Sequence, residues 1–326
     1  MTGTAKPSNA ADAVSAEQSA RFAAALGKLC PQGGRIGLAV SGGPDSLAML
    51  LLAHAAMPGE FEAATVDHGL RAEAAEEAAF VARICAARGI AHSVLRVEVA
   101  PGNVQDEARR ARYAALAAWA RERGFAALAT AHHADDQAET VLMRLNRGSG
   151  LGGLSGVRAR GTVPGGTLPV LRPLLSWRRA ELAALVAGAG IEAVSDPSNA
   201  DPRYDRVRMR TALAEADWLD AAAIAQSAAY LADAQEALDW AMEREWDANV
   251  EIVAGGIRYE PSAPRAIVLQ VLRRIFAGFG ADPRGGEIAR LADALSEGET
   301  GTLGGVVARP ETGGWTFRPE PPRKSA

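Results

Sequence analysis

The sequence predicts an α/β fold in which a domain built on a parallel β-sheet precedes a smaller, mainly helical domain. Within the first 145 residues, short apolar runs alternate with longer stretches in which Ala and Leu recur with the helical period of about 3.6 residues. Strands joined by helix-length connections form parallel sheets that helices cover on both faces. After about residue 212 the alternation stops and helical patterns dominate. We therefore expect domains over 1–212 and 213–326.

The elements follow in chain order. Strands are predicted at 35–40, 61–66, 93–99 and 126–131, and the helices between them at 46–57, 73–88 and 104–123. A Gly-rich stretch over 147–176 is predicted to be a loop, with a helix over 177–187 after it. The second domain is predicted to hold helices over 214–249, 264–279 and 286–295 and a hairpin over 301–317.

The composition excludes several classes of protein. With 48% apolar and 23% charged residues the chain is an ordinary globular protein, and no apolar run is long enough to span a bilayer. The first fifteen residues lack the apolar core of a signal peptide, so we expect a loose leader. Two cysteines, Cys30 and Cys85, cannot form a disulfide framework or an iron–sulfur site. These observations predict a cytoplasmic protein that does not bind a membrane.

Positive charge is concentrated in one part of the chain. The net charge is −4, yet residues 141–212 contain eleven arginines against five acidic residues, so this window carries +6 and the rest −10. A local basic region on an acidic protein is typical of a selective polyanion binder. The alternative is that arginine is simply the preferred cation, because lysine occurs only at positions 6, 28 and 324.

The segment 41–46 lies between the first predicted strand and the first helix. Its glycines allow a sharp turn that brings backbone N–H groups to an anion, and the helix directs its positive end to the same place. Asp45 is suited to Mg²⁺, and the lack of lysine distinguishes the loop from G-x-x-x-x-G-K-[ST]. A plain turn is the alternative. The residues expected to bind phosphate are Ser41, Gly42, Gly43, Pro44, Asp45 and Ser46.

Two further polar clusters follow predicted strands. Asp67, His68 and Arg71 come after the second strand, and 132–136, His-His-Ala-Asp-Asp, after the fourth. Ligands of a parallel sheet bind beyond the carboxyl ends of its strands, so we expect the clusters and the segment 41–46 to form one active site. Arg71 suits a phosphate contact and a surface ion pair equally.

The segment 132–140 begins a helix with carboxylates in its first turn, where the helix dipole favours them. Asp135 and Glu139 share one face of that helix. We expect Mg²⁺ binding and a general base here, since carboxylates and imidazoles suit both tasks. A solvated acidic helix cap and a zinc site are the alternatives, although the spacing matches no zinc signature.

Two features leave alternatives open. The segment 148–153 satisfies G-x-G-x-x-G but follows a helix, which argues against a dinucleotide site and leaves a mobile lid or a plain connection. Arg109, Arg112 and Tyr113 lie around one turn of the predicted helix 104–123. Arg112 either faces the site or belongs to a solvated helix surface.

In order and spacing these motifs resemble those of the tRNA(Ile)-lysidine synthetases, a family of the PP-loop (N-type) ATP pyrophosphatases. The resemblance covers about residues 33–212. One departure is Val207, because the family has Arg-Asn-x-x-Arg where this chain has Arg-Val-Arg-Met-Arg, which leaves the role of that amide in doubt. The segments that carry the resemblance are 41–46, 67–71, 131–140, 147–154, 172–175 and 196–199.

The resemblance implies a Rossmann-like fold of the adenine nucleotide alpha hydrolase type and a ligase that works in two steps. ATP adenylates O2 of the wobble cytidine, position 34, of tRNA(Ile) with a CAU anticodon, and pyrophosphate leaves. The ε-amine of L-lysine then attacks C2 and expels AMP. The product, lysidine, changes the codon specificity from AUG to AUA.

The resemblance also implies roles for single residues. Catalysis is assigned to Asp45, His133, Asp136 and Glu139, with Asp136 or His133 as the base, and Mg²⁺ to Asp45 and Asp136. In addition to 41–46, the residues assigned to ATP are Asp67, His68, Arg71 and Arg112, and those assigned to tRNA or lysine are His132, Asp135, Arg147, Arg206 and Arg210.

Two other functions stay open at this point. A tRNA 2-thiolation enzyme of the same superfamily would use the same loop, but it needs cysteines for sulfur chemistry and only two are present. A regulatory ATP-binding module needs neither the 132–136 cluster nor the arginine-rich window. We assign tRNA recognition to 213–326, and the sequence leaves the oligomeric state open, a homodimer included.

Overall fold

The computed structural model describes residues 13–69, 73–97, 104–194, 203 and 205–321. The chain divides into two compact units, Met1–Leu231 and Ala232–Ala326, each with its own hydrophobic core. The long helix α9 (Ala221–Asn249) contributes to both. The division comes later than the expected boundary at 212, because α8 (Asp205–Glu215) packs against α5 (Ala134–Leu145) of the first unit.

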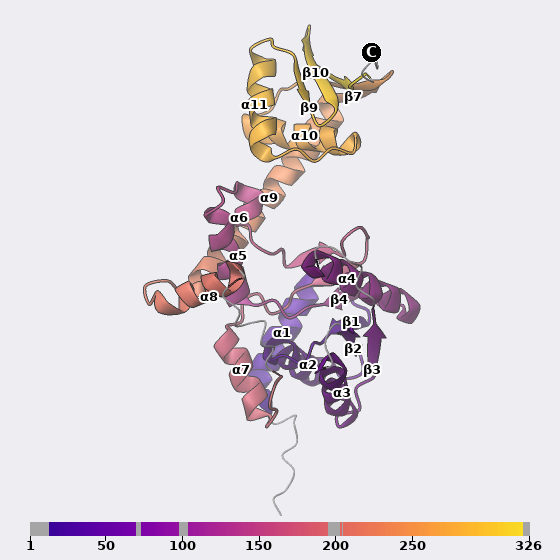
Figure 1. Cartoon of the computed structure of the whole chain (residues 1–326), viewed down its shortest axis with the longest axis vertical. Helices are drawn as coiled ribbons and strands as arrows, with labels where there is room; N and C mark the ends of the chain where they lie inside the picture. Colours follow the sequence, from indigo (N-terminus) through magenta and orange to yellow (C-terminus); the bar gives the residue numbers. More distant parts are fainter. Residues whose placement is uncertain (1–12, 70–72, 98–103, 195–202, 204, 322–326) are drawn as a thin grey trace, which may run out of the picture. The chain divides into compact units, whose positions relative to one another are not determined.

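The first unit is built on a six-stranded sheet (Figure 1). Five neighbouring strands run parallel, and the last is antiparallel to its neighbour. The parallel sheet predicted from the sequence is therefore confirmed. In spatial order the strands are β3 (His92–Arg96), β2 (Phe61–Asp67), β1 (Ile36–Ala39), β4 (Ala127–Ala129), β6 (Pro169–Leu171) and β5 (Arg160–Thr162).

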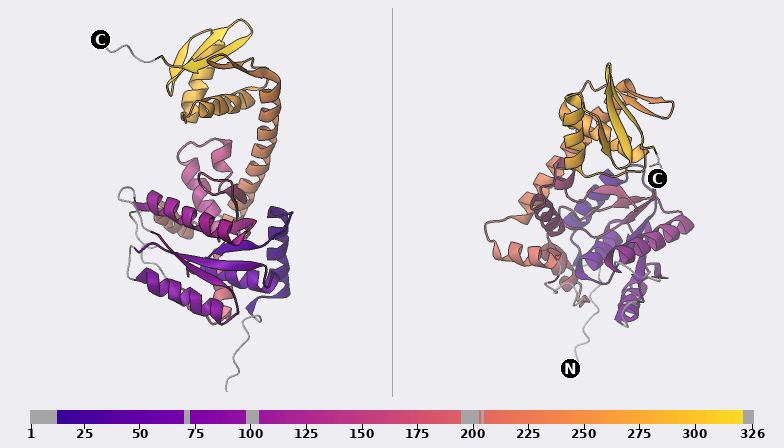
Figure 2. Two further views of the ribbon diagram at one scale, coloured as in Figure 1. Left: turned by 90° about the vertical axis from the view of Figure 1, so that its right-hand side faces the viewer. Right: turned by 45° about the horizontal axis from the view of Figure 1, so that its top comes forward.

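Helices cover both faces of this sheet (Figure 2). On one face, α4 (Val104–Arg123) packs Leu116 and Trp119 against the strands. Gly37 of β1 permits this contact, because a Cβ there would lie 2.5 Å from the Trp119 ring. A larger core on the other side joins the strands to α1 (Ala16–Leu29), α2 (Pro44–Ala56), α3 (Glu73–Ala86) and α7 (Arg179–Gly188).

The Gly-rich stretch predicted as a loop contributes two strands and the short helix α6 (Leu151–Leu154). In β6, Val170 pairs with Leu128 of β4, so β6 extends the parallel sheet. A three-residue strand carries too few side chains to show a period, which is why the sequence pattern missed it. The Gln137 side chain exchanges two hydrogen bonds with the Val157 backbone, of 2.9 and 2.6 Å, and these favour a fixed connection over a lid.

The second unit combines helices with an antiparallel sheet. Helices α10 (Arg265–Gly278) and α11 (Gly285–Ser296) match the predicted ones within one residue at each end. The predicted terminal hairpin is present and belongs to a larger sheet than expected. Its strands, in spatial order, are β7 (Val250–Val253), β8 (Gly256–Tyr259), β11 (Gly314–Pro319), β10 (Val306–Glu311) and β9 (Gly301–Leu303).

A buried carboxylate fastens α9 to this second unit. Glu245 accepts hydrogen bonds from the Tyr259 hydroxyl (3.0 Å) and the Ser262 N–H (2.8 Å). These hydrogen bonds replace those that the carboxylate would make with water in the unfolded chain. Across the part of the chain that the structure describes, no helix combines the length and the apolar character needed to cross a membrane.

Candidate active site

The loop after β1 forms a tight turn into α2. Gly42 has φ +88°, a left-handed conformation, and Gly43 caps α2. The Ser46 hydroxyl donates to the Gly43 carbonyl (3.0 Å) and accepts the Ser41 N–H (3.1 Å). Ser46 is buried, so its hydroxyl closes the turn, whereas Ser41 is exposed. The turn and the N-terminus of α2 together offer the backbone N–H groups that a phosphate needs.

Helix α5 begins at a buried histidine beside this loop. The His133 N–H donates to the Asp136 carboxylate (3.1 Å), and its ring Nδ1 accepts the Asp136 N–H (3.4 Å). Since Nδ1 accepts, a neutral ring carries its proton on Nε2. Nε2 lies 3.4 Å from Asp45 Oδ2 and 3.5 Å from Asp136 Oδ2, yet it has no hydrogen-bond partner among the described residues, and neither has the buried Asp45 Oδ1. A ligand would complete the bonding here.

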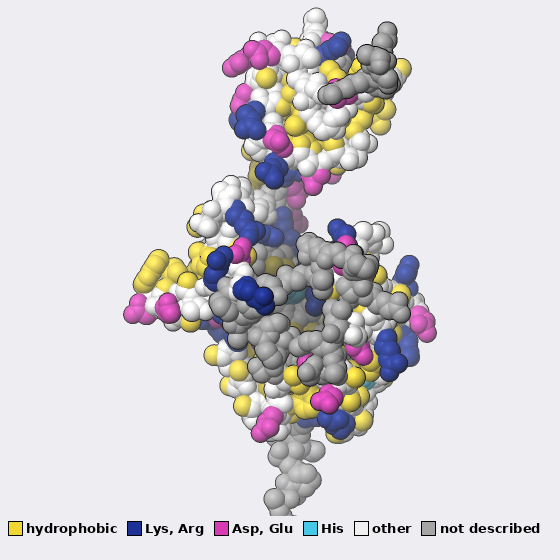
Figure 3. All heavy atoms as spheres, in the orientation of Figure 1, with side chains coloured by type: hydrophobic (Ala, Val, Ile, Leu, Met, Phe, Trp, Pro, Cys, Tyr) yellow, Lys and Arg dark blue, Asp and Glu magenta, His cyan; other side chains and the backbone are white. Residues whose placement is uncertain are grey.

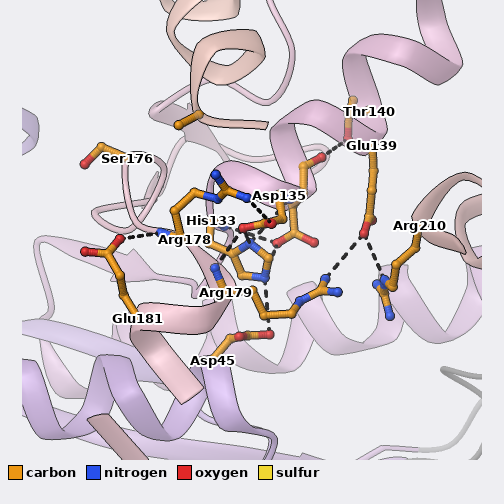
Figure 4. A network of polar contacts seen from close by, with 12 residues as sticks. Asp45, His133, Asp135, Glu139, Thr140, Ser176, Arg178, Arg179, Glu181 and Arg210 are labelled. Atoms are coloured by element: carbon orange, nitrogen blue, oxygen red, sulfur yellow. Dashed lines mark hydrogen bonds and ion pairs between the residues drawn. The ribbon is translucent and has the colours of Figure 1, made fainter. Parts of the chain in front are cut away.

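Asp135 fastens the start of α5 to α7. Its Oδ2 accepts the Arg179 N–H at 2.7 Å, and its Oδ1 accepts the Arg178 guanidinium at 3.4 Å (Figure 4). Burial acts to raise the pKa of Asp135, but the Arg179 amide and the Arg178 guanidinium outweigh it and hold that pKa below its usual value. Asp135, assigned from the resemblance to the substrate, is therefore a charged anchor of the helix.

Glu139 lies at the centre of a cluster of arginines. Its side chain is 1% exposed and accepts Arg206 Nε at 2.8 Å, Arg210 Nε at 2.9 Å and Arg179 at 3.4 Å. Arg206 also donates to Asp136 Oδ1 at 3.1 Å. A carboxylate withdrawn from water needs such compensation. Arg206 and Arg210, assigned to tRNA or lysine, thus contact the expected catalytic carboxylates.

Many arginines of the predicted basic region therefore pair with acidic or carbonyl groups of the same chain. Arg147 and Arg208 both contact Asp205, and Arg144 donates to two carbonyls of the Gly-rich stretch at 2.8 and 2.9 Å. The charge count over residues 141–212 starts just after the α5 carboxylates that neutralise some of its arginines. The count therefore overstated the positive charge of this part of the chain. In Figure 3, basic side chains gather over the part of the first unit where α5, α6 and α8 lie, with acidic ones among them.

The other predicted residues have simpler surroundings. After β2, the Asp67 carboxylate accepts the Gly69 N–H (2.9 Å) and closes a local turn, and His68 follows it at the same sheet edge. His132 Nδ1 lies 3.1 Å from the Thr130 hydroxyl. Burial lowers the pKa of His132 to about 4, so the ring is neutral at pH 7. Arg71 and the segment 196–199 lie outside the described residues.

Comparison with known proteins assigns this site to a family. A family model described as a PP-loop domain matches residues 15–217. The tRNA(Ile)-lysidine synthase of Novosphingobium aromaticivorans is 51% identical over 310 residues, which cover 94% of this chain and 94% of that protein. That of Zymomonas mobilis is 42% identical, over 91% of this chain and 92% of that protein. The chain belongs to the tRNA(Ile)-lysidine synthase family.

A solved structure supports the same fold for this lysidine synthase family member. The U34-tRNA thiolase NcsA of Methanococcus maripaludis superposes with a TM-score of 0.54 over 66% of this chain and 77% of that one, at 18% identity. At that identity the likeness shows the fold alone. The family makes the chain an enzyme whose PP-loop domain binds ATP.

Gly42→Ala is expected to weaken ATP binding about 5-fold or more and to lower the thermal midpoint by a few degrees. An L-residue at φ +88° is strained by roughly 1–2 kcal/mol, and its Cβ would lie 3.4 Å from the Val81 side chain. Gly59→Ala is the control, since Gly59 has φ +81° with nothing within 4 Å of a Cβ. Calorimetry and thermal unfolding check both variants. Equal loss of ATP affinity in the two would contradict a local effect.

A side chain of α1, Arg21, supports the α7 side of the candidate site. The Arg21 guanidinium donates to the Ser176 carbonyl (2.6 Å), pairs with Glu181 (2.9 Å) and lies 4.0 Å from the centroid of the Trp177 ring. The Trp177 carbonyl in turn accepts the Ala134 N–H at 2.8 Å. Arg21 is therefore linked to the start of α5 through residues 176–177, whose backbone carbonyls accept hydrogen bonds from Arg21 and from Ala134.

Arg21→Ala is expected to lower kcat several-fold with little change in KM for ATP, because Arg21 positions α5 without touching a substrate. Arg21→Lys keeps a positive charge but loses the planar guanidinium group with its fixed N–H donors, so it should restore kcat only in part. Lys28→Ala, an exposed change on the same helix, is the control. Steady-state kinetics check the three variants. An unchanged kcat in Arg21→Ala, or a rise in KM alone, would contradict this positioning role.

Sequence reasoning missed the residues of the Arg21 and α7 contacts: Arg21, Trp177, Arg178 and Arg179. None of them has a spacing that predicts chemistry. The one signal was the Trp-Arg-Arg run at 177–179, one residue after the segment 172–175 and at the start of a predicted helix. Such a run is typical of many solvated helix ends. Only the contacts in the structure distinguish this run from an ordinary helix end.

Proposed function

We propose that this protein ligates L-lysine to C2 of the wobble cytidine, position 34, of tRNA(Ile) with a CAU anticodon, and converts ATP to AMP and pyrophosphate. The names of its relatives support this reaction. The observation that carries it is the 3.4 Å approach of His133 Nε2 to Asp45 Oδ2. This approach joins the phosphate-binding loop after β1 to the carboxylate cluster after β4 in one site.

In the first step, O2 of the cytidine attacks the α-phosphorus of ATP and the α–β phosphoanhydride bond breaks. Pyrophosphate leaves with the electrons of that bond. The N–H groups of the loop after β1 and of the start of α2 hold the phosphates and stabilise the charge that develops on them. The absence of the usual P-loop lysine is consistent with cleavage at this bond instead of the β–γ bond.

Mg²⁺ fits the carboxylates of this site. Asp45 Oδ1 is buried and, within the described residues, unbonded, and Asp136 Oδ2 also lies close to His133 Nε2. No group of three or more potential metal-binding side chains occurs in the part of the chain that is described. This suits an ion held by one or two carboxylates together with substrate phosphates. Bound to Asp45 and Asp136, Mg²⁺ would neutralise phosphate charge.

In the second step, the ε-amine of lysine attacks C2, the C2–O2 bond breaks, and AMP leaves with its electrons. An amine attacks only when it is neutral, so a base must take its proton. We propose Asp136, because Arg206 on Oδ1 and the His133 N–H on Oδ2 hold its carboxylate in place. His133 is the alternative base, although its side chain is fully buried.

The decisive experiment measures pyrophosphate release and the modified nucleoside with unmodified tRNA(Ile), with and without lysine. We expect release to require tRNA(Ile) but not lysine, and lysidine to form only with lysine. tRNA(Met), which has the same anticodon, is the control substrate and should not react. Pyrophosphate release without tRNA, or binding of ATP with no tRNA-dependent release, would contradict the proposal.

The rival thiolation reaction is disfavoured by the state of Cys85. Cys85 is buried in the core of the first unit, and burial raises the pKa of its thiol to about 11. Such a thiol carries little of the thiolate needed for sulfur transfer. Recognition of tRNA by 213–326, a cytoplasmic location and a homodimer stay predictions of the sequence.

A further inference from the structure

Three arginines beside the site differ from those around Glu139. Arg109 and Arg112 of α4 lie over the ring of buried Tyr113, with guanidinium carbons 5.2 and 5.5 Å from its centroid. Arg172 follows β6 and is 8% exposed. Among the side chains that the structure describes, no carboxylate pairs with any of the three, whereas each arginine on Glu139 has its charge compensated.

Two of these cations are also withdrawn from water, whereas Arg109 is exposed. Burial lowers the pKa of Arg112 and of Arg172. Arg172 donates one hydrogen bond to the Arg158 carbonyl (2.7 Å), but its buried Nε has no partner among the described residues. Two desolvated cations, an exposed one beside them and a spare donor on Arg172, with no counter-ion among the described side chains, form an arrangement that a bound anion would complete.

The cluster adjoins the reaction site. The Thr130 N–H donates to the Leu171 carbonyl at 2.9 Å, which sets Arg172 beside the chain that leads from β4 to the 132–140 segment. His132 lies within electrostatic reach of Arg172, Arg109 and Arg206 and of the Asp136 carboxylate. His132 is therefore close both to members of the arginine cluster and to a carboxylate of the proposed reaction site.

We propose that Arg109, Arg112 and Arg172 bind a phosphate group of the RNA backbone next to the nucleotide that reacts. The proposal rests on the function proposed above. Guanidinium groups match phosphate in geometry, and phosphate contacts fix the register of a nucleic acid without reading its sequence. The triphosphate of ATP has the same chemistry, but the loop after β1 already offers it N–H donors. The proposal therefore replaces the ATP contact that the family resemblance implies for Arg112.

The helix supplies a matched control for this proposal. Arg110 lies between Arg109 and Arg112 in sequence, is exposed, and pairs with Glu107 at 2.9 Å. We would measure the Kd of an unmodified tRNA(Ile) transcript and, separately, that of α,β-methylene-ATP. Arg109→Ala and Arg112→Ala should each raise the RNA Kd about 10-fold and lower its salt slope by about 1. The analogue Kd should change less than about 2-fold, and Arg110→Ala should change neither.

A second measurement identifies the contact itself. A neutral methylphosphonate at the contacted position of an anticodon stem-loop should weaken binding to the wild-type protein but not further weaken binding to Arg112→Ala. A higher analogue Kd with an unchanged RNA Kd would overturn the proposal and assign the cluster to ATP. An equal effect of Arg110→Ala would overturn it in favour of general charge. Thermal unfolding verifies that each variant is folded.

These outcomes are separable from a failure of the proposed function. If the wild-type protein binds the transcript through the arginines but forms no lysidine, the function fails and the phosphate site stands. If lysidine forms and the variants bind RNA normally, the phosphate site alone is overturned. Arg172→Lys completes the series, because it keeps a cation where alanine would leave the Arg158 carbonyl without its donor.

Discussion

Asp45→Ala lowers tRNA-dependent pyrophosphate release by at least about 100-fold and leaves the first unit folded. The large effect is expected because Asp45 is the carboxylate nearest the phosphate-binding turn and one of the two proposed Mg²⁺ ligands. Removal of one preorganised electrostatic contact to a developing charge costs about 100- to 1,000-fold in other enzymes. Pyrophosphate release, measured under saturating ATP and tRNA(Ile), checks the prediction.

The fold should tolerate this change because the cost of the buried Asp45 oxygen to stability is at least as large as the gain from the position of Asp45 in the helix. Its Oδ1 is buried without a partner within the described residues, which costs about 1–3 kcal/mol. Its position in the first turn of α2 contributes about 0.3–1 kcal/mol in the opposite direction. We therefore expect an unchanged or slightly higher thermal midpoint.

Asp45→Asn separates charge from shape, since it keeps the size of the side chain and removes only the negative charge. We expect it to be as inactive as Asp45→Ala. Full pyrophosphate release by Asp45→Asn would show that the charge is dispensable and would remove Asp45 from the proposed metal ligands. A large fall in the midpoint of either variant would instead place Asp45 in the structure of the turn.

The sheet and its ligand-binding edge were predictable because both depend on patterns that are local in sequence. β1, β2 and β4 are short apolar segments, and the polar residues that follow them reveal the edge without any knowledge of long-range contacts. The motifs that resemble the family lie in the same places. β6 was not predictable, since its three residues form a strand only because β4 lies beside them.

The pairing of the arginines could not be predicted for a related reason. Arg206 and Arg210 meet Glu139 across 67 and 71 positions of sequence, so a count of charge over a contiguous window cannot find them. The same holds for Arg172 and Arg112, which approach one ring from separate elements. Composition alone suggested one basic surface. The contacts show that α5 carboxylates neutralise Arg206 and Arg210 of this region, whereas Arg172 of the region and Arg112 from outside it are still available to an anion.

Glu139→Gln is expected to destabilise the first unit by about 2–3 kcal/mol and to reduce lysidine formation beyond what unfolding explains. The glutamine is of similar size but neutral, so three arginines lose the charge that balances them. Removal of one partner from a buried ion pair costs about 3–5 kcal/mol. We expect somewhat less because the side chains of Arg179, Arg206 and Arg210 are 31%, 44% and 32% exposed and water solvates them in part.

The predicted loss corresponds to a fall of about 5–10 °C in the thermal midpoint of the first unit, which calorimetry would measure separately from the second unit. Glu107→Gln is the control, since it breaks an exposed ion pair with Arg110 and should cost less than about 1 kcal/mol. Equal midpoints for the two variants would contradict a central role of Glu139 in the fold.

The catalytic part of the prediction rests on Arg206, which bridges Glu139 and Asp136. Without the charge of Glu139, Arg206 shifts toward Asp136 and competes with the lysine amine for that carboxylate. Turnover should therefore fall about 10-fold at a temperature where the variant is folded, and raising the lysine concentration should recover part of it. A loss of turnover that follows the folded fraction alone would show that Glu139 stabilises the protein without shaping the site.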